Sequence, residues 1–190
     1  DAQRATEEGA PLVASELYDL LIAFIDDYNK ELFEQQHPDK ASEYNPAIGL
    51  EMKRIELLSS AAFNLQQVSP VEVPRLILNI LAILNQWNPQ TEQELGFATE
   101  ACCSVSRLLG SCAAYPASLY MAKQACERAK DHIQKFGLSS TMQKIREEAW
   151  YLRLTDAILC KDKTAAKQAS ETLMELLEEE SSTRLDTDSV

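Results

Sequence analysis

Glycine and histidine are scarce in this chain of 190 residues, and their scarcity limits the chemistry it can perform. The five glycines stand singly, so no stretch forms the glycine-rich loop that cradles a phosphate. The two histidines, His37 and His132, are far apart, and no Cys or His residues cluster at zinc-binding spacing. We therefore expect no cofactor, no metal site and no catalytic residues, so that the chain is not an enzyme.

The cysteines lack the pairing of a disulfide framework. Their number is odd, and no two of them form a CxxC motif. All of them fall at apolar positions of expected helices, where a thiol behaves as a small hydrophobic group. This usage is typical of a reducing compartment, and it predicts a cytoplasmic or nuclear location. The five are Cys102, Cys103, Cys112, Cys126 and Cys160.

The chain also lacks the two-residue alternation of β-strands, and its apolar runs are too short to cross a membrane. Leu, Ala, Glu, Lys and Gln dominate, and these residues lose least on entering a helix. The short links between periodic segments favour antiparallel neighbours. The sequence thus predicts an all-α fold of about seven antiparallel helices in stacked helical hairpins, with a non-repetitive bundle as the alternative. The expected helices span about 11–36, 46–68, 74–87, 92–110, 117–136, 140–160 and a segment after 163.

The helical stack is expected without a repeated motif. When the tetratricopeptide pattern is placed with its tryptophan at Trp150, it fails at Arg153, Leu154 and Ser170. No other helix pair repeats its spacing. The similarity to helical repeats is therefore one of architecture alone.

The stretch 74–87 carries apolar residues on every side of a helix, which predicts a central helix covered on all sides. On this interpretation Leu81 is buried, and Leu81→Asp unfolds the domain. We expect a flexible segment over 1–9, one helical domain over 10–178 and a disordered acidic tail over 179–190.

The formal net charge of −12 opposes binding to nucleic acid. No group of residues points to catalysis. We therefore expect a scaffold, adaptor or complex-subunit domain that binds another protein, and we expect the bound part of that partner to be an acidic or helical peptide segment. The expected helix 117–136 is locally basic, and aromatic residues near it are suitable interface anchors. The candidate partner-binding residues are Tyr115, Tyr120, Lys123, Arg128, Lys130, Lys135 and Trp150.

Two other functions stay open at this point. One is a regulatory domain that binds an apolar ligand or lipid beside Leu78 and Leu81 of the central helix. The other is a small helical enzyme or a cochaperone. The tripeptide 37–39, His-Pro-Asp, is similar to the motif that J-domain cochaperones use to stimulate Hsp70, although the helix before it is acidic rather than basic.

Overall fold

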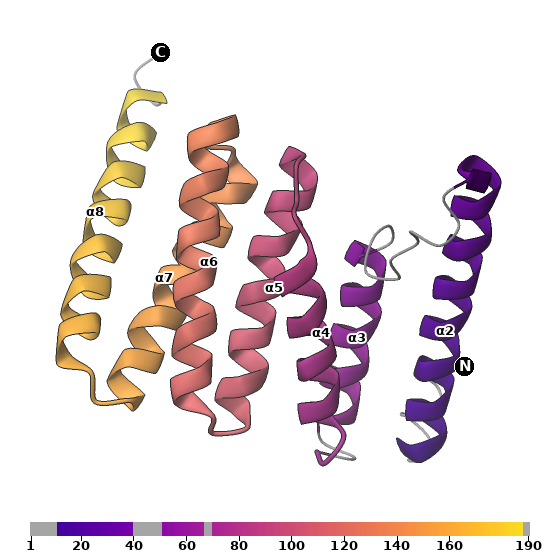
Figure 1. Ribbon diagram of the computed structural model, residues 1–190. Coiled ribbons are helices and arrows are strands. Elements are labelled where there is room, and N and C mark those ends of the chain that lie inside the picture. The colour runs from indigo at the N-terminus through magenta and orange to yellow at the C-terminus, as the bar shows by residue number, and fades with distance from the viewer. Residues whose placement is uncertain (1–10, 40–50, 67–69, 188–190) are drawn as a thin grey trace. The chain divides into compact units, whose positions relative to one another are not determined.

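The computed structural model describes residues 11–39, 51–66 and 70–187, and within these ranges it contains seven helices and no strand (Figure 1). The all-α fold is confirmed. Parts of the expected second helix and the segment 1–9 lie outside the described residues. The helices are α2 (Pro11–Gln36), α3 (Glu51–Leu65), α4 (Val73–Gln86), α5 (Glu92–Ser111), α6 (Tyr115–Phe136), α7 (Ser140–Leu159) and α8 (Lys163–Thr187).

The chain falls into two compact units, and the single domain expected over 10–178 stays a prediction. Unit 1 is Asp1–Pro89 and contains α2, α3 and α4, and unit 2 is Gln90–Val190 and contains α5 to α8. The last helix also continues to Thr187, into the segment 179–190 for which we expected a disordered tail.

In unit 1, α3 contacts both α2 and α4. The helical period places the buried residues of α3 on one face, at Ile55, Leu58, Ala61, Ala62 and Leu65. On α2, in contrast, Leu20, Phe24 and Tyr28 are exposed. Unit 1 therefore has its core between α3 and α4, and it leaves an apolar stripe of α2 uncovered.

The helix α4 is amphipathic, which corrects the expectation of a helix covered on all sides. Leu78 is 65% exposed, and Leu81 is only half-buried. The residues Arg75 and Asn79 are exposed beside Leu78, so this side of the helix is largely polar. Apolar content alone did not reveal that one face of the helix meets solvent. The buried residues are Val73, Leu76, Ile77, Ile80, Ile83 and Leu84.

Unit 2 consists of two helical hairpins, α5–α6 and α7–α8, which also contact each other through α6 with α7 and α5 with α7. The tight turn between α5 and α6 contains Ala113, with φ of 58°, and the turn between α7 and α8 contains Lys161, with φ of 59°. A capping box formed by Thr91 and Glu94 begins α5. At the start of α7 the cap is Ser139, whose hydroxyl accepts a hydrogen bond from the Met142 amide.

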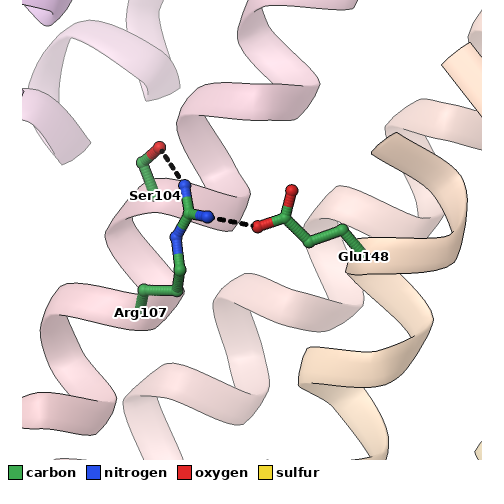
Figure 2. Close-up of polar contacts among 3 residues, drawn as sticks. All are labelled: Ser104, Arg107 and Glu148. Carbon is green, nitrogen blue, oxygen red and sulfur yellow. Dashed lines mark hydrogen bonds and ion pairs between the residues drawn. The ribbon is translucent and has the colours of Figure 1, made fainter. Parts of the chain in front are cut away.

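Small side chains fill the contact between α5 and α6. Ala98, Ala101, Ala122, Ala125 and Ala129 are all buried, and residues of this size allow helix axes to approach closely. At the edge of the stack, Arg107 of α5 forms an ion pair with Glu148 of α7 and also donates to the Ser104 hydroxyl, as Figure 2 shows. The two hairpins are thus joined by apolar packing inside and by a charged pair at the rim.

The burial pattern of α4 yields a test of unit 1. Ile80→Asp places an unpaired charge at a position with no exposed surface, so we expect it to lower the free energy of unfolding by about 3 kcal/mol or more. Leu78→Asp is the matched control on the exposed face, with an expected change within about 0.5 kcal/mol. Urea unfolding followed by circular dichroism measures both. Equal losses for the two variants would contradict the amphipathic α4.

Candidate functional site

Unit 2 contains a pocket of about 380 Å³ between α6, α7 and α8, which we call the α6–α8 pocket. Its volume lies near the lower end of the range that small-ligand sites occupy, and it is large enough for one or two bulky side chains of a partner. The lining residues are Cys126, Glu127, Lys130 and Ile133 from α6, Arg146, Trp150 and Arg153 from α7, and Thr172 and Leu176 from α8.

Two of the seven candidate residues predicted from the sequence meet in this pocket. Lys130 of α6 and Trp150 of α7 both line it. Lys130 is exposed, and no described acidic side chain pairs with it. Trp150 is half-buried, with its ring covered on one side by a guanidinium group. An unpaired cation and an aromatic ring therefore border the same cavity.

The other five candidates do not line the α6–α8 pocket. Arg128 lies beside Cys102 of α5, where its charge and its hydrogen bond act on the thiol. Tyr120 is 59% exposed, and Lys135 is exposed in the last turn of α6. Tyr115 and Lys123 are half-buried. Of the seven candidates, the pocket therefore brings together Lys130 and Trp150 alone.

Arg153 is the best-anchored residue of the pocket. Its guanidinium carbon lies 4.6 Å from the centre of the Trp150 ring, within the range of a cation–π interaction. Its Nη2 donates to Gln168 Oε1 of α8 over 2.8 Å. It also hydrogen-bonds the Cys126 thiol of α6, and the two interactions with this thiol act to lower its pKa. One side chain thus connects all three helices that line the pocket.

Three cysteines, Cys102, Cys103 and Cys126, are buried, whereas Cys112 is exposed, which corrects the expectation that all five lie at apolar helix positions. Burial raises the pKa of Cys126 to about 12, even though Arg153 acts in the opposite direction. Burial likewise raises the pKa of Cys102 to about 11 and that of Cys103 far above its ordinary range. Such thiols stay protonated at neutral pH, whereas the nucleophilic form of cysteine is the thiolate. These three cysteines are therefore in the environment of side chains that pack in the core.

The lowered pKa of Glu94 belongs to helix capping. Its carboxylate accepts hydrogen bonds from the Thr91 and Gln90 amides, and these bonds favour the charged form. Glu94 is half-buried at the start of α5 and is not among the residues that line the α6–α8 pocket. Its shift therefore requires no catalytic explanation.

Two buried polar residues lie close to the pocket helices. Asp156 of α7 is 4% exposed, and it accepts hydrogen bonds from Ser118 of α6 over 2.6 Å and Ser106 of α5 over 3.1 Å. His132 of α6 is 2% exposed, packs against Phe136, and has no hydrogen-bond partner for Nδ1. Asp156 joins three helices, whereas His132 is a core side chain with one unsatisfied nitrogen.

Sequence reasoning missed the two arginines of the pocket. Arg146 and Arg153 flank Trp150 on α7 at positions i, i+4 and i+7, which share one face of a helix. Neither was singled out from the sequence, because arginine side chains usually lie in solvent. The signal that could have found them was their common face with Trp150.

Comparison of the chain with protein-family models, with curated proteins and with solved structures finds no match in any of the three. Within the described ranges, no helix combines the length and the apolar character that crossing a bilayer requires. Over the same residues, no three or more His, Cys, Asp or Glu side chains are grouped to hold a metal ion. The geometry of the α6–α8 pocket is therefore the feature from which a function can be inferred.

Thiol reactivity tests the burial around the pocket. At pH 8 we expect iodoacetamide to modify the exposed Cys112 first, since for Cys102, at a pKa of about 11, roughly one thiol in a thousand is ionised. Mass spectrometry of the folded protein against time gives the order, and the same reaction in urea should modify all five. Modification of Cys126 as fast as Cys112 would contradict a protonated, buried Cys126.

The unsatisfied nitrogen of His132 yields a second test. His132→Phe keeps a ring against Phe136 and removes a buried polar atom that has no partner, so we expect the free energy of unfolding to stay constant or rise by up to about 1 kcal/mol. Urea unfolding measures it, with the exposed His37→Phe as control. A loss of more than about 2 kcal/mol would show that the imidazole makes an interaction that phenylalanine cannot replace.

Proposed function

We propose that this chain is a protein-interaction module, a scaffold, adaptor or complex-subunit domain without catalytic activity, and that the α6–α8 pocket is its binding site. The observation that carries the proposal is the arrangement of Trp150 and Arg153 beside the unpaired Lys130 in one cavity. Tryptophan and arginine are the residue types most enriched at the energetic centres of protein interfaces. The stacked hairpins hold these side chains on helices, which suits a preformed site.

The ligand we propose is a protein segment. Helices pack into grooves between other helices through apolar anchors, and the pocket provides apolar walls from Ile133 and Leu176. Polar groups at its edge would orient such a segment and exclude wrong partners. The alternative of an apolar ligand beside α4 has less support, because Leu78, its expected wall, is 65% exposed.

The proposed location is the cytoplasm or the nucleus. All five cysteines are free thiols, and Cys102, Cys103 and Cys126 are buried without forming a disulfide. A reducing compartment preserves thiols in that state. This part of the proposal depends on cysteine chemistry and is independent of the pocket.

Affinity capture tests the binding site. We immobilise the full chain, Trp150→Ala and Lys130→Glu, with Lys135→Glu as a matched control for charge reversal outside the pocket. Proteins that bind the wild type and the control should be lost from Trp150→Ala, since truncating an interface tryptophan typically costs about 2 kcal/mol, or thirtyfold in affinity. Thermal melting verifies that each variant folds. If both pocket variants retain the same proteins as the control, the pocket is not the binding site.

A further inference from the structure

One face of α2 carries exposed apolar side chains, which we call the α2 stripe. Leu20 and Phe24 are 66% and 69% exposed, so neither is covered by α3, the helix that α2 contacts. Separations of three, four and seven residues place all members on one face, and the twelve residues from first to last rise about 18 Å. The result is a contiguous apolar surface of the kind that marks an interaction site. The members are Leu20, Leu21, Phe24, Tyr28 and Leu32.

The edge of the α2 stripe is acidic. Asp27 and Glu31 are exposed, and each follows an aromatic residue of the stripe by three positions, which places it beside that ring on the helix surface. The one lysine of the helix, Lys30, pairs instead with Glu34 over 4.0 Å. Over its whole length α2 contains six acidic residues and one basic residue. The stripe is therefore an apolar surface within a strongly negative helix.

This charge decides between the occupants that an exposed apolar helix face can take. Helices that lie on a membrane surface carry lysine and arginine, which attract anionic headgroups, whereas α2 would be repelled by them. A second copy of the chain would bring two helices of the same sign together, and like charges across an interface are unfavourable. A partner with basic residues beside an apolar face is attracted both by the edge of the stripe and by the formal charge of −12 on the whole chain.

We infer that the α2 stripe binds an amphipathic helix of a partner protein whose apolar face is bordered by lysine or arginine. The apolar side chains of the stripe pack against that face, and Asp27 and Glu31 meet the cations at its border. The stripe belongs to unit 1 and the α6–α8 pocket belongs to unit 2. The inference therefore adds a second binding surface to the proposed function and does not depend on the pocket.

Three synthetic fifteen-residue helical peptides test the inference against the full chain. All have leucines at positions 4, 8, 11 and 15. The lysine peptide has lysines at 5 and 12, at the border of the leucine face, the displaced peptide has them at 6 and 13, on the opposite face, and the glutamate peptide has glutamates at 5 and 12. Fluorescence anisotropy should show the lysine peptide binding about threefold more tightly than the displaced peptide and about tenfold more tightly than the glutamate peptide. Equal affinities for the three, or loss of the preference in Trp150→Ala of the pocket, would overturn the inference.

A charge swap locates the binding on α2. The double variant Asp27→Lys with Glu31→Lys should bind the glutamate peptide more tightly than the lysine peptide, a reversal that misfolding cannot imitate. The matched control is Glu100→Lys with Glu175→Lys, which changes the net charge equally at two exposed glutamates of unit 2. The control should keep the preference for the lysine peptide. If the two double variants behave alike, the peptides respond to net charge alone and the inference is wrong.

Phe24→Ser tests the apolar part of the surface, with Tyr151→Ser, at an exposed aromatic residue of unit 2, as the matched control. Phe24→Ser should weaken binding of the lysine peptide about tenfold and leave the melting temperature unchanged, whereas the control should change neither. A melting temperature lowered by more than about 5 °C would show that the chain itself covers the stripe. Dimerisation, or binding to phosphatidylserine vesicles, that Phe24→Ser abolishes would identify a second copy or a membrane as the occupant. Each of these three results would overturn the inference.

Discussion

The buried carboxylate of Asp156 is the constraint on which the arrangement of unit 2 depends. A carboxylate at 4% exposure is costly unless hydrogen bonds replace its water, and here the hydroxyls of Ser106 and Ser118 supply them. These donors come from α5 and α6, so α7 cannot slide along either helix without breaking a buried interaction. The register of α7 then fixes where Trp150 and Arg153 lie.

With α7 in this register, the pocket forms because α6 uses one face to pack against α5 and another to line the cavity. The alanines of α6 pack toward α5, whereas Cys126, Lys130 and Ile133 line the cavity toward α7 and α8. Arg153 reaches across to Gln168 and so connects α7 to α8 at one end of the cavity. Arg153 is therefore held in place before a ligand binds, and ordering it would cost a ligand little conformational entropy.

The sequence was sufficient to predict the helices but not to predict which neighbours cover their faces. Periodicity and local signals such as the Thr91–Glu94 capping box are encoded within a few residues, so the fold class and most helix ends could be predicted. Burial depends on which neighbour covers a face, and α4 shows the difference, since Leu78 is as apolar as Ile80 and yet exposed. For the same reason Lys130 and Trp150 were recognised by residue type. The spacing of Arg146 and Arg153 places them on the same face as Trp150, but only the structure shows which neighbouring helices enclose that face.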